Sequence, residues 1–100
     1  MKLADARGAV RAAEQFNADQ VSPASSYLAL ARQETAEGKQ LLEVGRKQRA
    51  GYVLERAAAD AELALALASE APVRAEAQRT LDQVQQLQQG VGGSGTEVKP

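Results

Sequence analysis

The chain lacks both cysteine and histidine, and only 3% of its 100 residues are aromatic. Without cysteine there are no disulfides, no thiolate metal ligands and no cysteine nucleophile. Without histidine, the usual imidazole base and the commonest metal ligand are missing together. There is also no glycine-rich phosphate loop. We therefore expect a protein that is not an enzyme, with no catalytic residue, no metal and no cofactor.

The chain also lacks an excess of either charge and any long apolar run. Twelve Lys and Arg residues face thirteen Asp and Glu residues, so no net field draws the protein to nucleic acid. Charges at Lys2 and Asp5 exclude the apolar core of a secretory signal at the start, although a trimmed chain would look the same. No segment approaches the roughly 20 apolar residues of a membrane-spanning helix. We expect a soluble chain whose only route to a membrane is a lipid anchor that these residues do not contain.

What the chain does have is alanine, most of all at residues 57–68, which read AAADAELALALA. Alanine has the highest intrinsic helix propensity, and its small side chain lets a neighbouring helix approach closely. Because alanine buries little area, the core should be thin, with leucine and valine rows and alanine filling the contacts. This composition predicts an all-α protein, a three-helix antiparallel bundle in a single domain over residues 1–89.

The apolar spacing places the helices at about 2–18, 22–44 and 47–89. Ser22 is expected to cap the second helix, with Pro23 at its first position, and Gly45 is expected to close it in a left-handed conformation. Gly38 falls where a large residue would be expected. It is either a tolerated helix glycine that costs about 1 kcal/mol or the point of a close helix crossing.

Pro72 lies inside the third helix, yet the apolar spacing resumes beyond it. A kink near Pro72 fits this pattern better than a stop, and the alternative is a separate fourth helix that begins at Ala71–Pro72. The first two helices are too short to cover the third, so its second half should project. Residues 90–100 are glycine-rich and are expected to form a flexible tail or linker. The projecting part carries a candidate partner-binding stripe of Ala77, Leu81, Val84 and Leu87.

Pairs of acidic residues such as Asp60 with Glu62, and Glu34 with Glu37, are expected to be solvated surface charges. Asp60 is the exception because it interrupts the alanine face. It would pair either with Arg56 one turn earlier, which contributes only a few tenths of a kcal/mol, or with Arg32 across the helices. The second possibility makes Arg32 and Asp60 a candidate structural pair that fixes the register of the second and third helices.

The order of these features resembles a bacterial family of domains of unknown function found in envelope lipoproteins, sometimes ahead of an OmpA-like peptidoglycan-binding domain. The resemblance covers roughly residues 3–89, and its fairly specific piece is the ADAELA segment at 59–64. The family usually has an aromatic residue where this chain has Val21 or Lys47, and a lipid-bearing cysteine near its start that is absent here. The resemblance implies a tetratricopeptide-like helical hairpin and a periplasmic protein tethered to the outer membrane, with no catalytic residues to transfer.

Two functions follow as hypotheses. The first is a noncatalytic interaction or scaffold module of the bacterial envelope, with its partner in the groove between the second and third helices or on the projecting stripe. The second is a cytoplasmic helical adaptor or oligomerisation subunit, which applies if Met1 is the native start. In either case the expected partner is a protein or a second copy of the chain, which would associate through the segment after Pro72.

Overall fold

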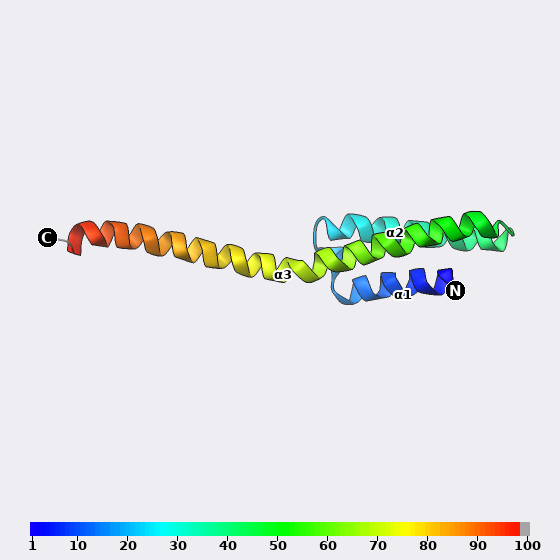
Figure 1. Cartoon of the computed structure of the whole chain (residues 1–100), viewed down its shortest axis with the longest axis horizontal. Coiled ribbons are helices and arrows are strands. Elements are labelled where there is room, and N and C mark those ends of the chain that lie inside the picture. The colour runs from blue at the N-terminus through cyan, green and yellow to red at the C-terminus, as the bar shows by residue number, and fades with distance from the viewer. Residues whose placement is uncertain (99–100) are drawn as a thin grey trace.

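The computed structural model describes the backbone of residues 1–98 and the side chains of residues 1–90. Within these residues it has three α-helices packed against one another, one short 3-10 helix and no strands (Figure 1). The all-helical prediction with a long third helix is thereby confirmed. The elements are α1 Lys2–Gln15, η1 Ala18–Gln20, α2 Ala24–Glu43 and α3 Lys47–Val98.

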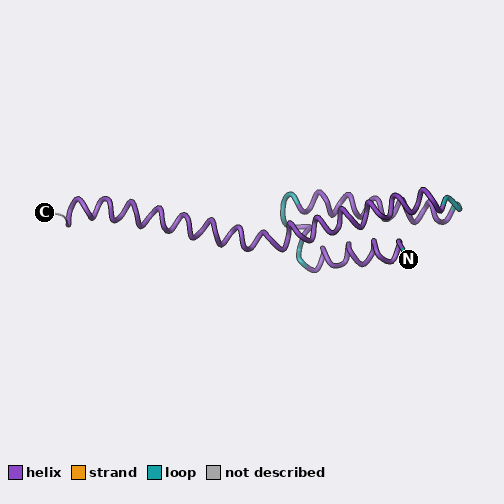
Figure 2. The backbone as a smooth tube through the Cα atoms, viewed as in Figure 1, coloured by secondary structure: helices purple, strands orange, loops and turns teal. Residues whose placement is uncertain are grey.

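The helices form a short bundle with one long extension, as the backbone trace shows (Figure 2). Consecutive helices run in opposite directions, and the first half of α3 lies against both α1 and α2. The second half of α3 leaves the bundle, and no other element of the described part lies beside it. The molecule is therefore a rod with extents of 82 × 17 × 16 Å.

The first connection begins earlier than the sequence predicted. Helix α1 ends at Gln15 rather than near residue 18, and Asn17 takes a left-handed conformation with φ of 60°. Asparagine tolerates this conformation better than most residues. The chain then makes the single turn η1, and the side chain of Ala18 in this turn is fully buried.

The start of α2 corrects a second prediction. The helix begins at Ala24 with Pro23 as its cap residue, and no side chain makes a capping hydrogen bond there. Ser22 therefore does not cap it. The backbone closes the turn instead, because the amide of Ser25 donates to the carbonyl of Val21 at 2.7 Å.

The end of α2 confirms the expected role of Gly45, whose φ is +82°. The Gly45 amide donates to the Leu42 carbonyl at 3.1 Å, and the Arg46 amide donates to the Leu41 carbonyl at 2.8 Å. These two bonds are the Schellman motif, which satisfies the last carbonyls of a helix and needs a left-handed residue that glycine adopts without strain. The motif turns the chain directly into α3.

Alanine dominates the core, which corrects the expectation of leucine and valine rows with alanine only filling the contacts. Leu28 and Leu54 are the largest fully buried side chains, and every other buried hydrophobic residue in the described part is alanine. The run at 57–68 supplies one continuous buried face, since its alanines recur at three- and four-residue intervals. The members of that face are Ala57, Ala61, Ala64 and Ala68.

Gly38 marks a close crossing of α2 and α3, which decides between its two interpretations. A Cβ atom at this position would lie 2.5 Å from Cγ of Leu54, whose side chain is 1% exposed. Leucine thus fills the space that a larger residue at position 38 would need.

Pro72 does not end α3, which continues without interruption from Lys47 to Val98. The alternative of a separate fourth helix is therefore wrong. The helix changes direction gently where it leaves the bundle (Figure 2), as expected where proline removes a backbone donor and crowds the preceding turn. The helical backbone also passes the expected end at Gln89. The tail or linker role of 90–100 stays a prediction, because residues 99–100 and the side chains of 91–98 lie outside the described residues.

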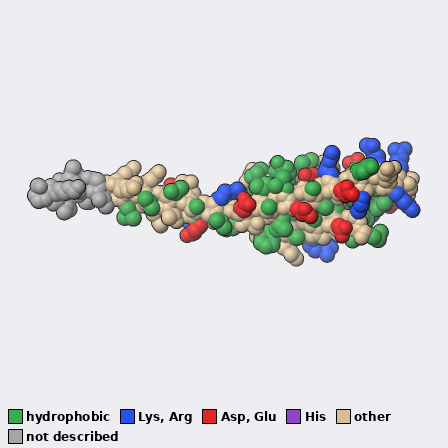
Figure 3. Space-filling model, viewed as in Figure 1, with side chains coloured by type: hydrophobic (Ala, Val, Ile, Leu, Met, Phe, Trp, Pro, Cys, Tyr) green, Lys and Arg blue, Asp and Glu red, His purple; other side chains and the backbone are tan. Residues whose placement is uncertain are grey.

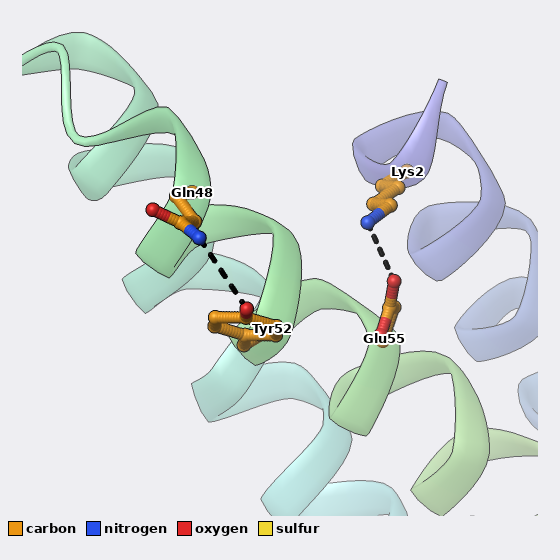
Figure 4. A network of polar contacts seen from close by, with 4 residues as sticks. All are labelled: Lys2, Gln48, Tyr52 and Glu55. Atoms are coloured by element: carbon orange, nitrogen blue, oxygen red, sulfur yellow. Dashed lines mark hydrogen bonds and ion pairs between the residues drawn. The ribbon is translucent and has the colours of Figure 1, made fainter.

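Exposed polar contacts add little to this packing. Lys2 of α1 donates to Glu55 of α3 at 2.5 Å, and Gln48 donates to the Tyr52 hydroxyl at 3.4 Å within α3 (Figure 4). Both members of the Lys2–Glu55 pair are more than half exposed. Exposed ion pairs contribute about 0–1 kcal/mol, so apolar packing is the main source of stability.

Candidate interaction surface and an interhelical carboxyl pair

The projecting half of α3 presents the predicted stripe to solvent. Every residue from Pro72 to Gly90 is exposed. The exposed fraction is 56% for Leu81, 43% for Val84 and 67% for Leu87. Near Pro72 the surface is slightly hollowed, and apolar groups of Val73, Ala77 and Leu81 line most of the depression. Apolar side chains are visible along the extension in the space-filling view (Figure 3). The structure thus places the stripe on a surface that no other part of the described chain covers.

The stripe lies on a different side of α3 from the face that builds the bundle. The bundle face ends with the buried Ala68 and the partly buried Ala71. The stripe starts at Ala77, nine residues after Ala68, and nine residues turn an α-helix by about 180° beyond two full revolutions. The three- and four-residue apolar spacing therefore continues beyond Pro72, but the apolar residues there lie on a different side of the helix. A partner bound to the stripe would not continue the layer that α1 and α2 form.

The candidate pair of Arg32 and Asp60 is not formed. Arg32 instead donates to Glu14 of α1, with 2.6 Å between Nη2 and Oε2. Both side chains are close to half exposed, so the pair is an ordinary surface contact of small energy. Asp60 faces a different residue of α2, Glu34.

Glu34 is the charged residue that sequence reasoning missed. Its side chain is only 13% exposed, which corrects the expectation of a solvated carboxylate. Its Oε1 atom is buried with no hydrogen-bond partner, and Oε2 lies 3.9 Å from Nε of Arg56 on α3. Asp60, one turn beyond Arg56, brings a second carboxyl group to the same place. Two carboxyls and one distant cation therefore share the α2–α3 interface.

This environment favours the protonated form of Glu34. Burial is the largest cause, followed by the hydrogen bond to Asp60 and the charge of Asp60, and together they raise the pKa of Glu34 from 4.5 to about 7. Arg56 acts in the opposite direction, and Glu37 adds a small further increase. Two ionised carboxylates have no proton to share, so the hydrogen bond between Glu34 and Asp60 exists only when one of them is protonated.

A signal for Glu34 was present in the sequence. It lies three residues after the buried Ala31 and four before the buried Gly38, which is the spacing of the packed face of α2. The pairing of Glu34 with Glu37 as surface charges obscured this position. A charged residue at core spacing needs a partner across the interface, and the second carboxyl at Asp60 lies at the edge of the matching alanine face.

The described residues contain no group of three or more acidic, histidine or cysteine side chains placed to hold a metal ion. None of the helices in the described part combines the length and the apolar content that crossing a bilayer requires. Comparisons with protein-family models, with curated proteins and with solved structures found no match for this chain.

Proposed function

We propose that this chain is a noncatalytic helical interaction module, and that the projecting half of α3 holds its partner. The observation that carries the proposal is the exposed stripe of Ala77, Leu81, Val84 and Leu87 on a helix that has left its bundle. Contiguous exposed apolar surface on a helix is typical of a docking face. The bundle then serves as the base from which the helix projects.

The alanine core and the position of Glu34 support the same role. Its core is mostly alanine, and Glu34, the carboxyl whose pKa is raised among the described residues, lies between packed helices. The partner in this proposal is a protein or a second copy of the chain, bound by helix packing. The tetratricopeptide-like character of the α2–α3 hairpin belongs to the proposal as well.

The envelope location is part of the proposal and depends on the resemblance over residues 3–89. In that setting the module would be the periplasmic part of an outer-membrane lipoprotein. The second candidate is a cytoplasmic adaptor or oligomerisation subunit, which the same exposed stripe favours equally. The genomic sequence upstream of Met1 separates the two, because a signal with a lipidation cysteine supports the first and a true start codon supports the second.

The stripe is tested first by the solution mass of the chain. We expect light scattering to show self-association of the intact chain at high concentration, because adjacent Leu and Val side chains on an exposed helix gain roughly 1.5–3 kcal/mol each when buried. Replacing Leu81 and Val84 with serine should abolish that association. The matched control replaces Ala75 and Gln86 with serine on the opposite side of the same helix, and should leave the mass unchanged.

Monomer masses for all three proteins at every concentration would remove the second copy as the partner and leave a different protein. Self-association that persists in the Leu81→Ser, Val84→Ser variant would show that another surface is responsible. A truncation after Ala71 that still associates would place that surface on the bundle.

A further inference from the structure

The two carboxyl groups at the α2–α3 interface form an arrangement that a scaffold role does not require. Glu34 comes from α2 and Asp60 from α3, so any force between them acts directly across the contact that holds the hairpin together. Glu34 is largely buried, and its Oε1 atom has no hydrogen-bond donor in the described residues. A buried carboxylate oxygen without a donor is destabilising unless a proton reaches the site.

The charged neighbours are too few and too far away to replace that proton. From α3, Arg56 approaches Glu34 at 3.9 Å, but its side chain is 76% exposed and so remains mostly hydrated. From α2, Glu37 adds negative charge. The cation nearest in sequence, Arg32, is engaged with Glu14 of α1. One arginine therefore faces three carboxyl groups, and the Glu34 side chain is only 13% exposed.

We propose that Glu34 and Asp60 form a proton-binding site that couples the α2–α3 contact to pH. With one proton bound, the two carboxyls share a hydrogen bond across the interface. Without it, two like charges face each other across the packed contact between α2 and α3. This is a charge-and-burial device of the kind that makes a helix interface respond to pH.

The pKa of Glu34 places the response near neutrality. A rise from 4.5 to about 7 corresponds to roughly a 300-fold gain in proton affinity on folding. Because the folded chain holds the proton more tightly than the unfolded chain, the resulting stabilisation is complete below about pH 4.5. It decreases as pH rises and is lost once the pH has passed through about 7.

Two measurements on the full chain test the proton affinity of Glu34 and its effect on stability separately. Carboxyl carbon NMR should show Glu34 titrating near pH 7, well above an ordinary glutamate. The urea midpoint of the wild-type chain should fall between about pH 5.5 and about pH 8.5. In Glu34→Gln, whose amide carries no charge at any pH, that fall should largely disappear. The matched control is Glu62→Gln, an exposed carboxylate two residues from Asp60, which should keep the wild-type slope.

The Asp60→Asn variant distinguishes the effect of Asp60 on the pKa of Glu34 from the effect of burial. Burial is the larger cause of the shift, so this variant should lower the titration midpoint of Glu34 only part of the way to its ordinary value. An unchanged midpoint in Asp60→Asn would overturn the pair. Titration of wild-type Glu34 in the ordinary carboxyl range, or a wild-type slope in Glu34→Gln, would overturn the proton-binding site itself.

Discussion

Gly38→Ala should destabilise the bundle by about 1–2 kcal/mol, although alanine is the better helix former by about 1 kcal/mol. The added Cβ would lie 2.5 Å from Leu54 Cγ, and Leu54 has no exposed space into which it can move. The free-energy cost of overpacking is then larger than the gain in helix propensity. Urea unfolding followed by circular dichroism measures the difference.

Two further proteins make this result specific to the crossing. Gly8→Ala is the matched control, because a Cβ at Gly8 meets nothing within 4 Å, and it should stabilise the chain by up to about 1 kcal/mol. In a Leu54→Ala background, Gly38→Ala should change sign and become stabilising, since the opposing side chain is gone. A stabilising Gly38→Ala in the wild-type background would show that the helices do not cross so closely.

Leu28→Ala should cost about 2–5 kcal/mol, a large share of the stability of a small domain. Leu28 is fully buried and belongs to a cluster otherwise built mainly from alanine. The buried alanine neighbours have no flexible side chains that could move into the cavity, so only the partly buried residues packed around them, such as Val10 and Leu65, can recover part of the loss. The thermal unfolding midpoint should fall by several degrees or more.

Leu30→Ala is the matched control for this deletion. Leu30 lies two residues along the same helix and is 45% exposed, so the same change should cost well under half as much. Comparable losses at both positions would mean that the buried face of α2 is not the one seen here.

The sequence was informative wherever the local pattern decides the structure. Alanine spacing located the packed face of α3, and Gly45 located the end of α2, because helix propensity and left-handed glycine act within a few residues. The start of α2 was less predictable. A serine before proline is a good cap signal, but a backbone hydrogen bond from Ser25 to Val21 completes the turn without it.

The candidate sites were harder to predict because they depend on which side chains meet across helices. Asp60 was correctly singled out as a break in the alanine face, but its facing residue is Glu34 rather than Arg32. Periodicity predicts which face of each helix is buried, but it does not determine the axial register between neighbouring helices. The change of side between the bundle face and the stripe, by contrast, follows from helix periodicity once α3 is known to continue through Pro72.

The central claim is that the stripe on the projecting half of α3 is where this protein meets its partner. The most direct measurement places a photoreactive amino acid at position 84 in the stripe, or at position 82 on the opposite side, and irradiates the intact cells that produce the protein. We predict a covalent protein adduct from position 84, with a second copy or another protein, and little or none from position 82. Equal adducts from both positions, or none from position 84, would contradict the proposed function.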